Sequence, residues 1–96
     1  MAIIDINIVD REQLLVEVTV PTVIEQVVIC NTSPGTITVS LFKLVQGTET
    51  RFYIINAIEL AVKETFVLED TRLESSFNLY VGISGGSASV NLTYFQ

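Results

Sequence analysis

Apolar and polar residues alternate along much of this 96-residue chain. The alternation is clearest over four stretches, Ile4–Ile8, Leu14–Val20, Leu79–Ile83 and Ala88–Tyr94. Successive side chains of a strand point to opposite faces, so a period of two places apolar residues on one face and polar residues on the other. Each stretch therefore predicts a half-buried β-strand.

The stretch from Glu25 to Leu44 has a different pattern, and we expect it to lie at the centre of the fold. It predicts two strands, Glu25–Cys30 and Thr36–Leu44, because Val, Ile and Thr dominate both. Asn, Ser, Pro and Gly at positions 31–35 supply a turn between them. In the first strand both faces are apolar, which is typical of a strand with neighbours on both sides.

The remaining pattern predicts further short strands and the turns between them. Helical spacing over Ala57–Glu64 offers an alternative, but the segment is too short for a stable helix and lacks a good cap. The other expected elements are strands at Phe52–Ile55, Ile58–Leu60 and Phe66–Leu68, turns at residues 46–50 and 62–64, a charged loop at Glu69–Arg72, and a hairpin loop at Ser84–Ser87.

These elements together predict an all-β protein, a single antiparallel β-sandwich of jelly-roll-like form with about eight short strands. Residues 1–96 suffice for one domain and hardly for two. No linker, repeat or low-complexity segment divides the chain.

Composition narrows the classes of partner. Apolar residues make up 49% of the chain and charged residues only 17%, below the roughly 25% of typical domains. The net charge is −6 and no basic cluster is present, so we expect neither nucleic acid nor an anionic membrane as a partner. The longest apolar runs, Val27–Cys30 and Phe52–Ile55, are too short to span a bilayer.

The sequence offers little catalytic chemistry. Histidine, the commonest general base and metal ligand, is absent. Cys30 is the single cysteine and is expected to be a small buried hydrophobe rather than a nucleophile. Two acidic pairs, Asp10 with Glu12 and Glu69 with Asp70, could ligate calcium or serve as a glycosidase pair, but acids in turns are mostly solvated. We predict no enzyme, and no catalytic, cofactor-binding or metal-binding residue.

Three aromatic residues form a candidate interface. Strand alternation directs Phe42, Tyr80 and Phe95 away from the face that fills the core, and interfaces favour aromatic side chains. This predicts a symmetric homo-oligomer, with a trimer as the expected form, or many copies on a shell. The alternative is that bends in the strands fold these rings back onto the core.

Several segments resemble those of small β-sandwich virion proteins of tailed bacteriophages. The matching residues are the turn Cys30–Ser33, Leu60 with the segment Glu64–Leu68, and the pair Gly85-Gly86. The resemblance covers roughly residues 14 to 96 and rests on turns and strand patterns. Relatives of this kind often carry a longer, glycine-containing insertion where this chain has the short stretch Val45–Arg51.

The resemblance implies a building role in the virion, which is assembled in the host cytoplasm. The expected function is that of a capsid decoration or cement protein, with the major capsid protein as its partner. The alternatives are a neck, tail or fibre component that contacts a tail or neck protein, and, from another class, a carbohydrate-binding module. Such modules commonly offer aromatic platforms to sugar rings, and this chain has no Trp and three Tyr.

Overall fold

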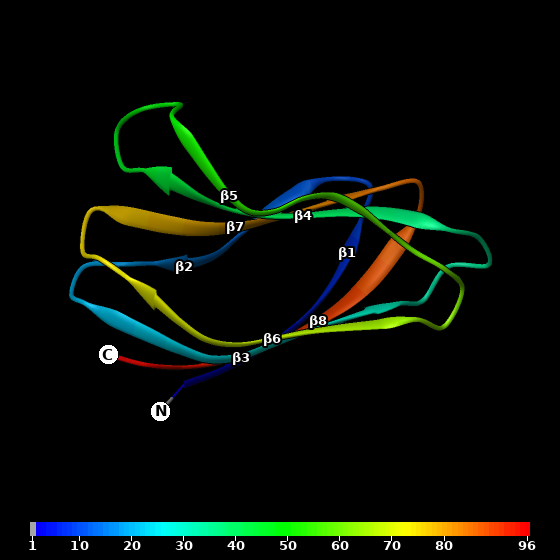
Figure 1. Ribbon diagram of the computed structural model, residues 1–96, viewed down its shortest axis with the longest axis horizontal. Helices are drawn as coiled ribbons and strands as arrows, with labels where there is room; N and C mark the ends of the chain where they lie inside the picture. Colours follow the sequence, from blue (N-terminus) through cyan, green and yellow to red (C-terminus); the bar gives the residue numbers. More distant parts are fainter. Residues whose placement is uncertain (1) are drawn as a thin grey trace.

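The computed structural model describes residues 2–96, which form eight β-strands in two four-stranded antiparallel sheets packed face to face (Figure 1). No helix in these residues is long and apolar enough to cross a membrane. The strands are β1 (Ala2–Val9), β2 (Glu12–Glu17), β3 (Thr22–Asn31), β4 (Ile37–Val45), β5 (Arg51–Leu60), β6 (Thr65–Leu73), β7 (Phe77–Ser84) and β8 (Ser87–Phe95).

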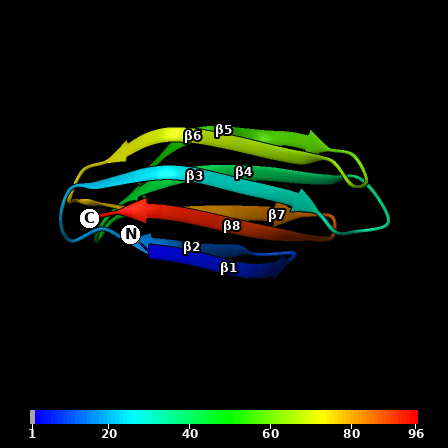
Figure 2. The same ribbon diagram turned by 90° about the horizontal axis from the view of Figure 1, so that it is seen from below.

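The order of the strands gives the sandwich a jelly-roll topology. Sheet A has the order β1-β8-β3-β6 and sheet B the order β2-β7-β4-β5 (Figure 2). The antiparallel pairs β4–β5, β3–β6, β2–β7 and β1–β8 form one long ribbon that is rolled up, which brings β8 beside β3 and β7 beside β4. The prediction of a single all-β sandwich is confirmed, and eight strands in this arrangement define the jelly roll.

Alternating side chains of both sheets fill the core between them. The interior strands β7 and β8 bury every second side chain there. β3 does so with a break between Ile24 and Val27, and β4 does so over Ile37–Leu41. The fully buried members from these strands are Ile24, Val27, Ile29, Ile37, Val39, Leu41, Leu79, Val81, Ala88, Val90 and Leu92. The predicted central position of the two strands around the 31–35 turn is confirmed, since β3 lies between β8 and β6 and β4 between β7 and β5.

The 84–87 loop was expected to join a hairpin, and that prediction is wrong. β7 belongs to sheet B and β8 to sheet A, so Gly85 and Gly86 carry the chain from one sheet to the other. The turn after β3 also crosses the sandwich. Turn residues establish that the chain reverses, but the partner of the next strand depends on which edges remain available.

Two strands are longer than the pattern indicated. β5 continues through Asn56 to Leu60, because Ala57 takes a φ of 54° and the register with β4 shifts there instead of the strand ending. β6 continues through the predicted charged loop to Leu73, with Asp70 at a φ of 53°. Both are edge strands, where one side faces solvent and charged or irregular residues are tolerated.

The three motifs behind the phage resemblance meet at one end of the sandwich, which carries the β1–β2, β3–β4, β5–β6 and β7–β8 connections (Figure 1). We call this the loop end. The buried Asn31 donates from Nδ2 to the carbonyl oxygens of Gly35, Leu60 and Ala61 at 2.9–3.1 Å. Its backbone N–H donates to the carbonyl oxygen of Glu64, also at the loop end. One side chain thus ties two connections together.

Ser33 and Asp10 join the β7–β8 connection to the same network. The N–H of Ser87 donates to Ser33 Oγ at 2.6 Å, and the N–H groups of Gly85 and Gly86 donate to Asp10 Oδ1. A Cβ at position 86 would lie 2.8 Å from the Cβ of Ser33, so only glycine leaves room for this contact. The motifs of the resemblance are therefore parts of one structural network.

Candidate interaction site

Three aromatic rings lie together on the outer face of sheet B. Phe42 of β4 is paired in register with Tyr53 of β5 on one side and with Tyr80 of β7 on the other. The ring of Phe42 is parallel to that of Tyr80 at a centroid separation of 5.6 Å, and tilted by 53° to that of Tyr53 at 5.5 Å. Such offset and tilted contacts suit aromatic quadrupoles. The cluster is therefore a packed unit outside the main core.

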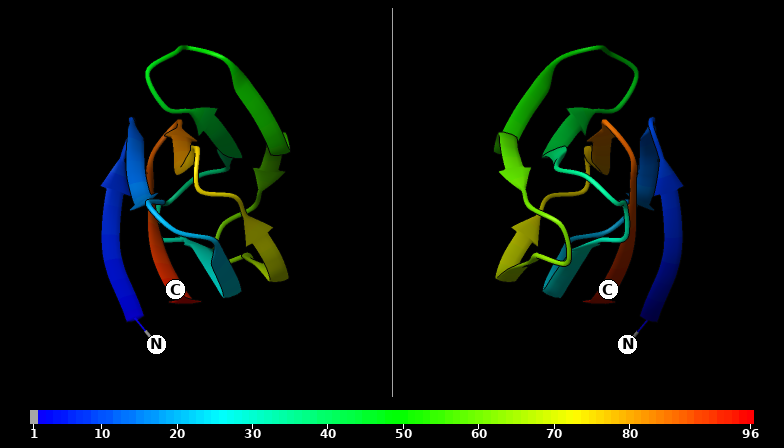
Figure 3. Two further views of the ribbon diagram at one scale, coloured as in Figure 1. Left: turned by 90° about the vertical axis from the view of Figure 1, so that its left-hand side faces the viewer. Right: turned by 90° about the vertical axis from the view of Figure 1, so that its right-hand side faces the viewer.

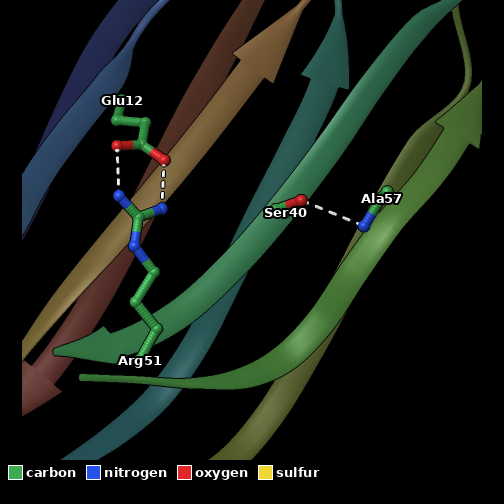
Figure 4. A network of polar contacts seen from close by, with 4 residues as sticks. All are labelled: Glu12, Ser40, Arg51 and Ala57. Carbon is green, nitrogen blue, oxygen red and sulfur yellow. Dashed lines mark hydrogen bonds and ion pairs between the residues drawn. The ribbon is translucent and has the colours of Figure 1, made fainter. Parts of the chain in front are cut away.

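An ion pair crosses this face and covers Phe42. Arg51 on edge strand β5 reaches over the sheet to Glu12 on the opposite edge strand, β2 (Figure 4). Its guanidinium donates to both carboxylate oxygens of Glu12, and one of these distances is 2.9 Å. The same guanidinium lies 4.4 Å from the centroid of the Phe42 ring, a cation–π contact. The pair therefore links the two edges of sheet B.

Hydrogen bonding raises the pKa of Arg51 above its ordinary value. The bond to the Glu12 carboxylate is the main cause, and a bond with Tyr53 adds to it. Because a guanidinium is charged at every physiological pH, the link does not respond to pH on the side of Arg51. Arg51 therefore keeps its positive charge over the Phe42 ring.

Two hollows adjoin the ion pair. The larger, of about 420 Å³, is lined by Glu12, Phe42, Leu44, Glu49, Arg51 and Tyr80. The smaller, of about 230 Å³, is lined by Arg11, Glu12, Thr38, Ser40, Tyr53, Gly82, Ile83 and Ser84. We call the two hollows and the rings between them the aromatic cleft. It offers ring faces, hydroxyl groups and charges of both signs within one surface.

The structure brings together two of the three residues predicted for an interface. Phe42 and Tyr80 stack on the outer face of sheet B, but Phe42 is buried beneath Arg51 and is not itself exposed. Phe95 is exposed at the end of β8 in the other sheet, so it belongs to a different surface.

Sequence reasoning missed Tyr53, Arg51 and Glu12 as members of this site. Tyr53 lies in an apolar run, Phe52–Ile55, that was assigned only to a strand. Its alternation with Arg51 could have indicated an outward face with an aromatic and a cation two residues apart. The partnership with Glu12 could not be found in this way, since it joins positions 39 residues apart through the pairing of four strands.

Two acidic pairs were candidates for a calcium or glycosidase site, and the structure places their side chains in other surroundings. Asp10 accepts backbone N–H groups at the loop end, whereas Glu12 pairs with Arg51. Glu69 and Asp70 lie in edge strand β6 beside a shallow hollow shared with Glu25. Among residues 2–96, no group of three or more His, Cys, Asp or Glu side chains is placed to hold a metal ion.

Cys30 was predicted to be buried, and that prediction is wrong. The thiol is half-buried on the outer face of sheet A, where the paired residues are Thr65 of β6 and Ser89 of β8. A hydroxyl group suits these polar neighbours. We therefore expect Cys30→Ser to lower the free energy of unfolding by less than about 1 kcal/mol. Urea unfolding measures this, and a loss above about 2 kcal/mol would show that the thiol packs as a core residue.

The fold defines a class, an eight-stranded jelly-roll domain, and the outer face of its sheet B carries the aromatic cleft. A scan against protein-family models finds no match, and searches of curated proteins and of solved structures find none either.

Proposed function

We propose that this protein is a non-enzymatic structural component of a tailed-phage particle, a decoration or cement protein that binds the capsid surface. The jelly roll is an architecture of viral capsid proteins and of lectins, and a fold alone does not assign a function. The observation that carries the proposal is the aromatic cleft. Its Tyr and Arg side chains are among those that dominate the energy of protein interfaces.

Tyr53 is the residue on which this binding depends most. Its side chain is 47% exposed although it packs against Phe42. An aromatic ring held by a packed neighbour loses little conformational freedom when a partner covers it, so most of the apolar contact contributes to affinity. The Arg51–Glu12 pair beside it supplies charge-assisted hydrogen-bonding groups that are already oriented.

A carbohydrate-binding module is the second candidate, and the smaller hollow favours it. Gly82 contributes no side chain to its lining, and Thr38, Ser40 and Ser84 contribute hydroxyl groups beside the exposed Tyr53. The Ser40 hydroxyl also accepts a hydrogen bond from the N–H of Ala57. Sugar rings present apolar C–H faces to aromatic rings and hydroxyl groups to polar side chains. The two candidates therefore share one surface and differ in the occupant.

Reconstitution of particles tests the proposal. Particles assembled without this protein are mixed with the wild type, Tyr53→Ser or Val67→Ser. Val67 has the same 47% exposure on β6 in sheet A, which makes it the matched control. We expect the wild type and Val67→Ser to co-sediment with particles, and Tyr53→Ser to bind about tenfold more weakly or worse.

The copy number in intact particles, measured by mass spectrometry, separates the virion positions. A number comparable to that of the major capsid protein supports decoration, and a few copies indicate a neck, tail or fibre component. Absence from particles, combined with binding on a glycan array that Tyr53→Ser abolishes, would replace the proposal with the carbohydrate-binding candidate.

A further inference from the structure

Strand β1 differs from the other edge strands of residues 2–96 in having a regular edge, with no register shift and no residue at positive φ. Its one charged side chain is Asp5, which accepts a hydrogen bond from the Asn91 amide of β8. β2 contains a register shift between Leu14 and Val16, β5 contains two shifts and Ala57 at positive φ, and β6 contains Asp70 at positive φ. Bulges and charges of this kind prevent strands from pairing with other molecules. β1 instead pairs with β8 in one unbroken register over all eight of its residues.

The outer edge of β1 carries free backbone groups. Asp10 donates its N–H to the carbonyl oxygen of Gly86, which extends the β1–β8 ladder beyond the Val9–Ser87 pair. In an antiparallel ladder, hydrogen-bonded residues alternate with residues whose N–H and C=O point the other way. The backbone groups of Ile3, Asp5, Asn7 and Val9 therefore point away from β8, and no strand of residues 2–96 pairs with them. β1 lies at the margin of the sandwich in Figures 2 and 3.

The side chains of β1 are complementary to a second β1 in antiparallel orientation. A two-fold axis at Ile6 places Ile6 opposite its own copy, Ile4 opposite Ile8, Asp5 opposite Asn7, and Ile3 opposite Val9. Ile3 and Val9 are 58% and 59% exposed, and this register lets each cover the other. Asp5 meets an amide instead of a second carboxylate, which avoids the like-charge pair that an axis at Asp5 would create.

We infer that two copies of this chain pair through β1 to form a two-fold dimer in which the two A sheets become one continuous eight-stranded sheet. The half-buried Ile4 and Ile6, which pack against the core, become more covered. An edge contact is smaller than an obligate interface, so the dimer depends on protein concentration. The pairing uses sheet A and leaves the aromatic cleft of sheet B free in both copies.

Sedimentation equilibrium of the wild type and of variants at Asn7 tests this inference. The backbone N–H of Asn7 points to the free edge and its side chain is exposed. Asn7→Pro removes that N–H while the β1–β8 ladder keeps its hydrogen bonds, so we expect a folded monomer. Asn7→Asp faces Asp5 of the second copy and should weaken dimerisation about fivefold, and Asn7→Lys should strengthen it by a similar factor.

Asn56 provides the matched control for charge, because it is also exposed on an edge strand, β5, which belongs to sheet B and not to the sheet of β1. Asn56→Asp and Asn56→Lys change the net charge by the same amounts as the corresponding Asn7 variants. They should alter the dissociation constant of the dimer by less than twofold. A wild type that stays monomeric at its highest soluble concentration overturns the inference, as does a trimer. If Asn7→Pro does not fold, the test depends on Asn7→Asp and Asn7→Lys, which should weaken and strengthen dimerisation respectively. If substitutions at positions 7 and 56 change the dissociation constant of the dimer equally, the proposed β1–β1 register is refuted.

Discussion

Leu79→Asp is expected to abolish folding at neutral pH. Leu79 lies on β7, a strand with neighbours on both sides, and its side chain is fully buried between the two sheets. The buried residues around it are aliphatic, and the ammonium group of its cross-strand neighbour Lys43 lies over the Phe77 ring, 5.0 Å from the ring centroid, and not in the core. An unpaired buried charge costs several kcal/mol, which is comparable to the whole stability of about 5–15 kcal/mol for a domain.

Circular dichroism and urea unfolding measure this effect. Leu79→Ala serves as a milder variant, for which we expect a loss of about 2–5 kcal/mol from the cavity it leaves. Glu59→Lys and Glu74→Lys alter charge at exposed positions and should stay within about 0.5 kcal/mol of the wild type. A Leu79→Asp protein that melts near the wild type would show that the side chain does not face the core.

Asn31→Asp is expected to destabilise the protein by about 3 kcal/mol or more, because several buried hydrogen bonds fail together. Asn31 is 2% exposed, and its amide group donates to three carbonyl oxygens of two different connections. A carboxylate in that place accepts hydrogen bonds and cannot donate them, so its negative oxygen faces the carbonyl oxygens directly. Of the side-chain hydrogen bonds, only the one that Oδ1 accepts from the N–H of Ser33 survives.

Asn56→Asp is the control, since it makes the same chemical change at an exposed position of β5. Urea unfolding compares the two variants. Hydrogen exchange of the backbone amide of residue 31 adds local evidence, because this amide donates to the carbonyl oxygen of Glu64 and its protection depends on the loop-end network. An Asn31→Asp variant within about 1 kcal/mol of the wild type would show that the loop end contributes little to stability.

The sequence by itself determined the fold class. Alternation over Leu79–Ile83 and Ala88–Tyr94 identified which side chains fill the core, since burial follows from the two-residue period of a strand. The doubly apolar stretch Val27–Cys30 identified an interior strand. Turn residues marked several reversals correctly, among them residues 46–50 and 62–64. These features depend on residues that are close together in the sequence, so the sequence pattern alone reveals them.

Tertiary structure alone decided the pairing of the strands and the make-up of the site. The Gly85-Gly86 turn is compatible with a hairpin, but β8 takes its place between β1 and β3 because the ribbon rolls as one unit. Phe42 alternates outward as the pattern indicated, yet it is buried because Arg51 crosses the sheet to Glu12. Asn31 was assigned to a turn, and its buried role depends on carbonyl oxygens of Leu60 and Ala61, far away in sequence. Contacts between distant positions follow from the geometry of the closed sandwich, and local pattern does not encode that geometry.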